Sequence, residues 1–287
     1  MPEIKLSHGT LQYRDEGTGP TIVLVHGLLV SGSVWDRLIP ELAPRARVIV
    51  PELPLGSHRK PMDPSADLTP PGLAALIVEL IQRLELSDVT LVGNDTGGAL
   101  SQLVVANHPQ RIARLVLVNC DAFEDFPPAA FKPVVKLLGR VPGAVAATAT
   151  LARLRAGRRA VFALAPLTVE PLPDELVKKW VAPLRVRAIR RDLIKVLRGI
   201  SPEHTLRAAE LLPGFGGSVL IVWGMRDRFF PVADAERLAA LFADARLERI
   251  ENARTFVQVD APERLAELIV ELLPASPERR AASLKGG

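Results

Sequence analysis

Cysteine and tyrosine are almost absent from this sequence. Each occurs once among 287 residues, as Cys120 and Tyr13, and aromatic residues make up only 5% of the chain. A single cysteine excludes an internal disulfide. Long apolar runs are missing too: Thr21–Val25 and Val219–Trp223 have strand length, far below the roughly 20 residues that cross a bilayer. The sequence therefore predicts no membrane span.

Several signals of targeting and cofactor binding are also missing. No basic start followed by an apolar run marks an export signal, which with the lone cysteine predicts a reduced, cytoplasmic protein. The histidines and acids lack metal-ligand spacing, so we expect no metal. The dinucleotide fingerprint and a glycine-rich phosphate loop are absent, so we expect no cofactor and no nucleic-acid partner. Nothing in the sequence fixes the oligomeric state.

Charge is unevenly distributed along the chain. Residues 131–200 hold 15 Lys or Arg and 4 Asp or Glu, whereas the remainder holds 21 basic and 28 acidic residues. Such a basic segment is typical of a solvated helical insertion. It is also able to attract an anionic substrate or a phospholipid surface over long range. Both interpretations stay open at this point.

Short β-branched runs alternate with amphipathic runs of helical length, which predicts an α/β fold with a mostly parallel twisted sheet flanked by helices. Strands are expected at Ile4–Ser7, Thr10–Arg14, Thr21–Val25, Arg47–Pro51, Val89–Gly93, Arg114–Asn119, Val219–Trp223 and Arg246–Ile250. Core helices are expected at Ser33–Leu42, Leu73–Leu84, Gly97–Ala106 and Pro262–Leu273.

The pattern changes in the middle of the chain. Between residues 123 and 202 prolines recur, helical periodicity dominates and no strand-like run appears. A shift of composition without a linker is typical of an insertion into a core. We therefore predict a core of residues 1–122 and 203–274, a helical cap of residues 123–202, and a flexible tail of residues 275–287.

One motif points to chemistry. An apolar strand leads through Gly93-Asn94-Asp95-Thr96-Gly97 directly into a helix. So tight a turn leaves no room for side chains two residues on either side of its apex, which explains Gly93 and Gly97. The apex side chain, Asp95, then lies at the positive end of the following helix. An ordinary turn with an aspartate helix cap is the simpler interpretation of the motif alone.

The context of this motif carries a resemblance to a known family. The chain resembles the α/β-hydrolase superfamily along nearly its whole length, and its Asp95 elbow is similar to that of haloalkane dehalogenases and epoxide hydrolases. This resemblance implies an α/β-hydrolase fold in which the aspartate attacks carbon to give an ester, which a histidine-activated water then hydrolyses. Backbone N–H groups of Leu28, in the His-Gly loop after an earlier strand, and of Thr96 are expected to form the oxyanion or halide site.

The acid that orients the histidine in such enzymes has two candidates here. Asp227 stands after the penultimate strand, in Trp223-Gly224-Met225-Arg226-Asp227, where the family places its acid. Asp121 stands after the sixth strand, at a second position that some dehalogenases use. We expect Asp227 to serve and retain Asp121 as the alternative.

The histidine itself is missing. Aligned on Phe256 and Asp260-Ala261-Pro262-Glu263, the family's histidine position holds Thr255, and a threonine hydroxyl does not act as a general base near neutral pH. His58 lies on a loop at the carboxyl end of a strand, the active-site side of such sheets. It is a possible substitute base, with surface hydrogen bonding as the alternative.

Other positions also depart from the family. Haloalkane dehalogenases have tryptophan after the nucleophile, where this chain has Thr96, and often asparagine after His-Gly, where it has Leu28. Trp180, in the predicted cap, is able to supply one indole N–H. The epoxide hydrolases use cap tyrosines as acids, but the one tyrosine here is Tyr13.

Three functions fit these residues. The first is a haloalkane dehalogenase-like hydrolase that uses Asp95 as nucleophile on a small apolar substrate, with slow or atypical turnover. The second is a lyase, isomerase or cyclase with Asp95 as general base. The third is a ligand-binding protein without turnover.

Overall fold

The structure, a computed structural model, describes residues 1–157 and 166–274. These residues form an eight-stranded sheet in the order β1-β2-β4-β3-β5-β6-β7-β8. Strands β3 to β8 pair in parallel, whereas β1, β2 and β4 are joined by antiparallel pairing. The strands are β1 (Glu3–Leu6), β2 (Gly9–Glu16), β3 (Thr21–Val25), β4 (Arg47–Pro51), β5 (Val89–Asp95), β6 (Ile112–Cys120), β7 (Ser218–Gly224) and β8 (Ala245–Ile250). The predicted fold class is confirmed.

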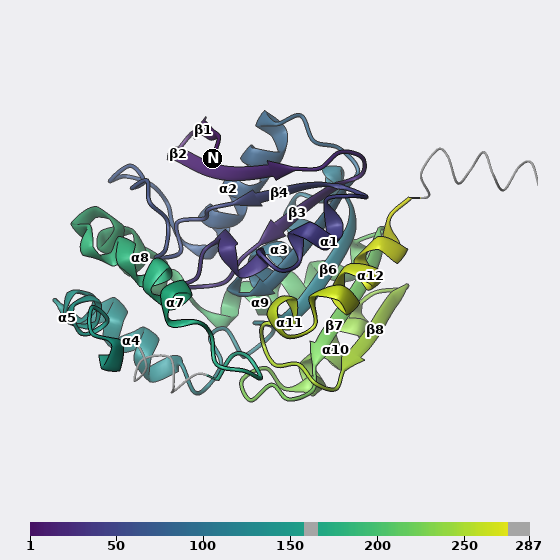
Figure 1. Cartoon of the computed structure of the whole chain (residues 1–287). Helices are drawn as coiled ribbons and strands as arrows, with labels where there is room; N and C mark the ends of the chain where they lie inside the picture. Colours follow the sequence, from purple (N-terminus) through teal and green to yellow (C-terminus); the bar gives the residue numbers. More distant parts are fainter. Residues whose placement is uncertain (158–165, 275–287) are drawn as a thin grey trace, which may run out of the picture.

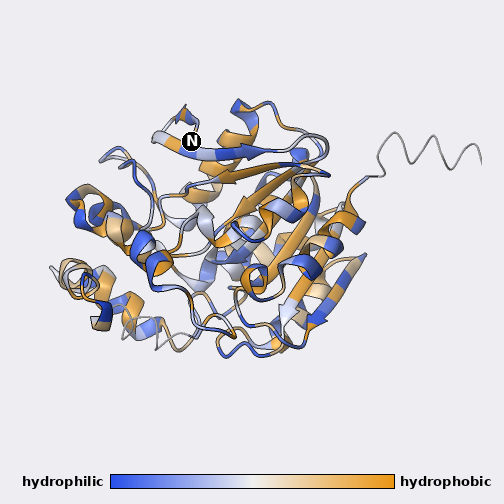
Figure 2. Cartoon of the chain, viewed as in Figure 1, coloured by the Kyte–Doolittle hydropathy of each residue, from blue (hydrophilic) through white to orange (hydrophobic). Residues whose placement is uncertain are grey.

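The apolar strands lie at the centre of the sheet because both of its faces are covered by helices (Figures 1 and 2). Apolar residues of α2, α3, α9 and α10 form one core layer with the sheet. Those of η1, α1, α11 and α12 form the opposite layer. Their bounds are η1 (Gly32–Trp35), α1 (Ile39–Leu42), α2 (Pro70–Arg83), α3 (Thr96–Asn107), α9 (Pro202–Leu211), α10 (Val232–Leu241), α11 (Val257–Asp260) and α12 (Pro262–Leu272).

One predicted helix is replaced by two shorter elements in the structure. The segment Ser33–Leu42 is not one helix but the short 3₁₀ turn η1 followed by the single helical turn α1. Pro40 has no N–H to donate and therefore fits the first turn of a new helix better than the interior of a long one. Ser31 caps η1 by accepting the N–H of Ser33.

Between β6 and β7 the chain forms a group of helices beside the carboxyl ends of the strands (Figure 1). They are α4 (Lys132–Arg140), α5 (Ala144–Leu151), α7 (Asp174–Val181), η3 (Ala182–Arg185) and α8 (Arg187–Gly199). Leu138, Val145, Ile189 and Leu193 belong to a small apolar cluster of their own in this group. Helix α9 then packs on α3 and returns the chain to the core. The predicted tail, residues 275–287, lies outside the described residues.

No single helix in the described part of the chain is both long enough and apolar enough to cross a membrane. Helices α4 and α5 meet that criterion only as a pair, and their axes are bent by 111°.

Candidate active site

Asp95 is the last residue of β5 and the cap of α3. Its backbone has φ 56° and ψ −133°, a strained conformation for a residue with a side chain. Glycine is required beside it: a Cβ on Gly93 would lie 2.5 Å from the carbonyl oxygen of Gly97 and from the hydroxyl of Ser101. The sequence motif thus forms the strand–turn–helix elbow that its spacing predicted.

One oxygen of the Asp95 carboxylate is held by backbone amides. Its Oδ1 accepts hydrogen bonds from the N–H of Thr96 and, at 3.4 Å, from the N–H of Leu28. Close approach requires Gly27, because a Cβ there would lie 2.6 Å from Asp95 Oδ1. Both residues predicted for the oxyanion site are therefore at Asp95, and their N–H groups point to its own carboxylate.

His26 fixes the loop that carries Gly27 and Leu28. Its Nε2 accepts the N–H of Leu53 at 3.0 Å, so its Nδ1 carries the proton and donates to the carbonyl of Gly27 at 2.9 Å. Burial lowers the pKa of His26 to about 4, so the ring is neutral near pH 7. A neutral histidine with both nitrogens bound is a structural element of the loop.

Asp227 and Thr255 lie together beside Asp95. Burial raises the pKa of Asp227, against hydrogen bonds from the N–H of Phe229 at 2.7 Å and from the side chain of Asn119 at 2.8 Å. The nearby Thr255 hydroxyl also lowers this pKa, yet its Oγ1 is buried without a hydrogen-bond partner of good geometry. Thr255 thus stands next to Asp227, at a position from which a side-chain N–H or O–H would donate to this carboxylate.

Asp121 contacts the side chain of Thr96, the residue that follows Asp95. Its Oδ2 accepts from the Thr96 hydroxyl at 3.2 Å, whereas its Oδ1 is buried without a partner. Burial, and then the charge of Asp95, raises the pKa of Asp121 well above the usual range. Burial and the charge of Asp95 therefore both favour the protonated form of Asp121.

Asp95 itself is surrounded by protein but keeps some solvent exposure. Burial raises its pKa, the amides of Thr96 and Leu28 lower it, and the nearby charge of Asp227 raises it again. The site thus combines three largely buried carboxyl groups, and the charge of Asp95 repels that of each of its two neighbours. This is the electrostatic pattern of groups arranged for reaction.

Two asparagines that the sequence analysis missed hold these parts together. The Asn94 side chain donates to the carbonyls of Val118 at 2.9 Å and Thr255 at 2.8 Å. Asn119 donates to Asp227 and accepts the N–H of Gly224 at 2.6 Å. Their signal was available, because each is a polar residue at the carboxyl end of an otherwise apolar strand, where active sites of parallel sheets lie.

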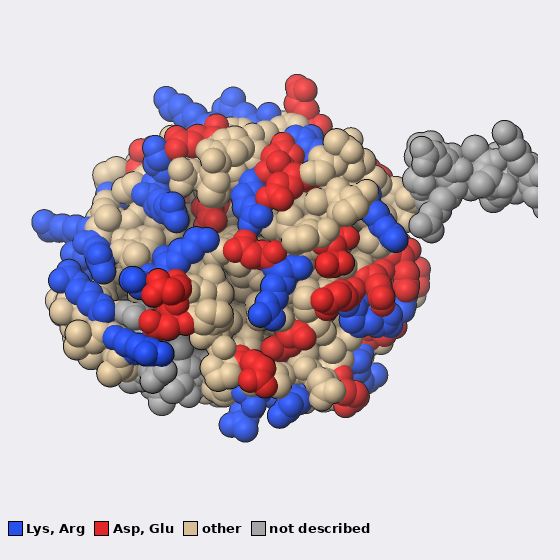
Figure 3. All heavy atoms as spheres, viewed as in Figure 1, with Lys and Arg blue, Asp and Glu red and all other residues tan. Residues whose placement is uncertain are grey.

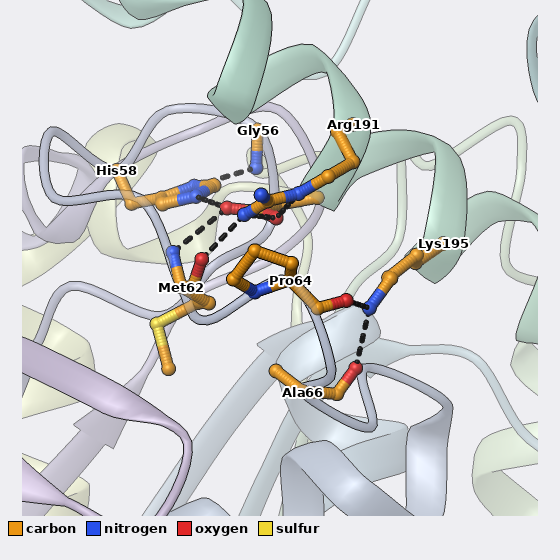
Figure 4. A network of polar contacts seen from close by, with 8 residues as sticks. Gly56, His58, Met62, Pro64, Ala66, Arg191 and Lys195 are labelled. Atoms are coloured by element: carbon orange, nitrogen blue, oxygen red, sulfur yellow. Dashed lines mark hydrogen bonds and ion pairs between the residues drawn. The ribbon is translucent and has the colours of Figure 1, made fainter.

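His58 does not join this group of residues. It is buried, its Nδ1 accepts the N–H of Gly56 at 3.3 Å, and its Nε2 faces Asp192 of helix α8, also at 3.3 Å (Figure 4). Both ring nitrogens are therefore engaged, which leaves no free lone pair to take a proton from water. This geometry disfavours the predicted role as substitute base, as well as its alternative on the surface, and favours a structural link to the helices between β6 and β7.

Asp192 is the centre of that link. It accepts the N–H of Met62 at 2.9 Å, while Arg191 and Lys195 of the same helix donate to backbone carbonyls of the loop at Met62–Ala66 (Figure 4). Burial raises the pKa of Asp192, but the hydrogen bonds from His58, Met62 and Arg191 outweigh burial and hold it below its ordinary value.

Trp180 is also engaged elsewhere. Its indole N–H donates to the Ser33 hydroxyl at 2.8 Å, and its ring packs edge-on against Phe256 with centroids 6.2 Å apart. The indole N–H of Trp180 is therefore already bound to Ser33 and does not offer a donor to a leaving group, which was its predicted role. Its contact with Phe256 instead supports the segment that carries Thr255.

The order and pairing of the eight strands, the elbow at Asp95 and the two amides at its carboxylate agree with the class of α/β hydrolases. The chain belongs to the alpha/beta hydrolase fold family, whose model matches residues 20–262. Among the described residues, no group of three His, Cys, Asp or Glu is arranged to hold a metal ion.

Similar proteins include several hydrolases. The chain is 30% identical over 280 residues to haloalkane dehalogenase 2 of Mycobacterium tuberculosis, a match that covers 92% of each chain. It is 26% identical to 2-hydroxymuconate semialdehyde hydrolase of Pseudomonas sp., over 90% of this chain and 88% of the relative. An alpha/beta hydrolase fold protein from Burkholderia ambifaria superposes with a TM-score of 0.78 at 26% identity, covering 94% and 97% of the two chains.

Proposed function

We propose that the protein is a haloalkane dehalogenase-like hydrolase in which Asp95 attacks a carbon atom of a small apolar substrate. The free carboxylate oxygen, Oδ2, forms the new C–O bond, and the leaving group departs with the electron pair of the bond that breaks. Water then attacks Cγ of the resulting ester, which releases an alcohol and restores the carboxylate once a proton has been lost.

The observation that carries this proposal is the position of Asp95 Oδ1 between the N–H groups of Leu28 and Thr96. These amides orient the carboxylate and leave Oδ2 as the attacking atom. In the ester, Oδ1 becomes the carbonyl oxygen and stays in the same hole. The negative charge that develops on it during attack by water is then stabilised by donors that are already in place.

The second step lacks a base, so we propose that it is slow. Histidine most often supplies proton transfer in such a step, worth about 10²–10⁴-fold in rate. Here Thr255 stands next to Asp227 and offers only a hydroxyl. An ester formed on Asp95 is therefore expected to accumulate.

Intact mass measurement tests the proposal. The protein is incubated with bromoalkanes, epoxides and activated esters beside an Asp95→Asn control. We expect an alkyl adduct on the wild type that is absent from the control. Product formation without any detectable adduct would contradict the slow second step; neither adduct nor product would contradict the proposed nucleophile.

The raised pKa of Asp95 favours a second candidate, a non-hydrolytic enzyme with Asp95 as general base. Such an enzyme abstracts a proton next to a carbonyl and needs no histidine. It would exchange substrate hydrogen with solvent deuterium and form no adduct. The same mass measurement, with deuterium incorporation into carbonyl compounds as a second readout, separates the two candidates.

A further inference from the structure

Apolar side chains project from one part of the cap. Here the cap face means residues 132–155, which contain α4, α5 and the turns beside them. Its large apolar residues Val134, Leu137, Val141, Leu151 and Leu154 each expose between 45% and 65% of their surface. Single exposed apolar residues are common on proteins, but five within 24 residues of sequence are a concentration that favours an interaction surface.

The spacing on α4 separates two faces. Val134, Leu137 and Val141 recur at intervals of three and four residues, so they share one side of the helix. Gly139 lies on the other side and meets Leu197 of α8, and Leu138, at the border between the two sides, is buried in the same apolar cluster. The exposed stripe is therefore not the side of α4 that packs into the cap.

Charge on the cap face has one sign. Lys132, Lys136, Arg140, Arg153 and Arg155 lie between or beside the exposed apolar residues, and the sequence from 131 to 157 contains no acidic residue. Figure 3 shows Lys and Arg side chains gathered over the cap end of the molecule with few acidic side chains among them, while acidic side chains are more numerous over the rest of the face. A partner for this surface must be both apolar and anionic.

We infer that the cap face docks on an anionic lipid surface. Apolar side chains inserted at the level of the headgroups, with lysine and arginine beside them, are the pattern of helices that lie in a membrane interface. Each basic residue near an anionic leaflet contributes about 1 kcal/mol, or about fivefold in affinity. The 111° bend between α4 and α5 fits helices that lie on a bilayer rather than cross it.

Charge complementarity favours lipid over a second copy of the chain. Outside residues 131–200 the sequence holds 28 acidic residues against 21 basic ones, but those acids are spread along the chain and many pair with arginine, as in Arg237–Glu124 and Arg246–Glu271. A lipid leaflet offers apolar chains below a continuous anionic layer and satisfies both properties of the cap face at once.

Docking on a bilayer brings the cap close to apolar molecules that are dissolved in the lipid. The apolar cluster of the cap helices packs on Leu28 and Leu29, in the loop that holds Asp95. A bilayer concentrates apolar molecules, so a docked cap shortens their path to the elbow. The inference about the surface does not depend on which reaction Asp95 performs.

Vesicle sedimentation tests the inference on the full chain. We expect binding to vesicles of phosphatidylcholine mixed with phosphatidylglycerol at low salt, weak binding to phosphatidylcholine alone, and loss of binding at high salt, where exposed charges are screened. The variant Lys136→Glu with Arg140→Glu should lose at least tenfold in partitioning. The variant Leu137→Ser with Leu151→Ser should also lose binding, with less dependence on salt.

Matched controls use similar residues elsewhere on the surface. Leu206→Ser with Leu211→Ser changes two exposed leucines of α9, and Arg45→Glu with Arg83→Glu changes two exposed arginines of the core. Both controls should bind as the wild type does. Absence of binding to anionic vesicles at low salt overturns the inference, and so does equal loss in cap-face and control variants. A concentration-dependent dimer that only the cap-face variants abolish would assign the face to a second copy and overturn it as well.

Discussion

In the proposed reaction, Thr255 is the residue that decides how long an ester on Asp95 persists. Its hydroxyl is buried beside Asp227 without a hydrogen-bond partner, so the environment there is polar and already holds an acid. Under the proposed function, Asp227 is the acid that would orient a histidine, and Thr255 occupies the position of that histidine. A retained acid beside a missing base is then the main difference between this site and that of the dehalogenases it resembles.

We predict that Thr255→His shortens the lifetime of the adduct on Asp95 at least about 100-fold, because an imidazole beside Asp227 can take a proton from water. A time course of intact mass after removal of excess substrate measures this lifetime. Thr255→Val is the control: it has nearly the same shape, removes only a hydroxyl without a partner, and should leave the adduct as stable as in the wild type. Equal lifetimes in both variants would contradict the assigned position.

How much of the site was predictable depended on whether a residue acts through the backbone or through its side chain. Asp95, Leu28 and Thr96 follow from one motif and one loop, because a tight elbow fixes backbone positions. The network of Asn94 and Asn119 did not follow, since side-chain hydrogen bonds across strands depend on register. The assignments of His58 and Trp180 met the same difficulty: partners from distant elements occupy their polar atoms.

Among the elements, the link between α8 and the loop at Met62–Ala66 joins the helices between β6 and β7 to the core. Asp192 is fully buried and accepts from the N–H of Met62, while Lys195 donates to the carbonyls of Pro64 and Ala66 at 2.6 and 2.8 Å. A buried carboxylate is stable only with such partners. The link therefore fixes where α8 lies over the sheet.

Removing Asp192 should destabilise the protein. We predict that Asp192→Ala lowers the free energy of unfolding by about 3 kcal/mol, because His58 and the N–H of Met62 are left buried without their acceptor. Urea unfolding measures the change. Glu175→Ala on the neighbouring helix α7 is the control, since its pair with Lys178 is exposed and is worth less than about 1 kcal/mol. A similar loss in the two variants would show that the buried link contributes little.

Elements were predicted well where a pattern is local. The central strands of the sheet were read from continuous apolar runs, and the order of strands and helices follows from their alternation. Extents were predicted less well: β6 begins at Ile112, two residues before the predicted start, because pairing with β5 extends it. The arrangement of α4, α5 and α8 was not predictable, because the local pattern of each helix does not determine how neighbouring helices pack.

Over the whole molecule, two buried groups titrate in opposite senses between pH 4 and 6.5. Burial lowers the pKa of His26 to about 4, so the unfolded chain binds more protons in this range and acidification through it destabilises the fold. Burial and the charge of Asp125 raise the pKa of Asp234 to about 6. The folded chain then binds more protons from that group, and acidification stabilises it.

We predict that Asp234→Asn reveals this opposition. The variant loses the stabilisation that Asp234 gains on acidification from pH 6 to pH 4, so its unfolding free energy should fall more steeply than that of the wild type over this range. Urea unfolding at half-unit pH steps measures the difference between the two proteins. Parallel curves from pH 7 to pH 4 would contradict the raised pKa of Asp234.

The sheet is open, so it has two edges at which another molecule could add a strand. Its two edges are β1 and β8, and an unpaired edge is a template on which another chain can add a strand. Strand β8 carries the charged residues Arg246, Glu248 and Arg249. Arg246 forms ion pairs with Glu248 and with Glu271 of α12, and Arg249 pairs with Glu236 of α10. On β1, Glu3 pairs with Lys60. Charged residues in ion pairs at a sheet edge oppose the addition of a strand from a second molecule. Substitutions that replace the charges of β8 with apolar residues are therefore expected to promote aggregation.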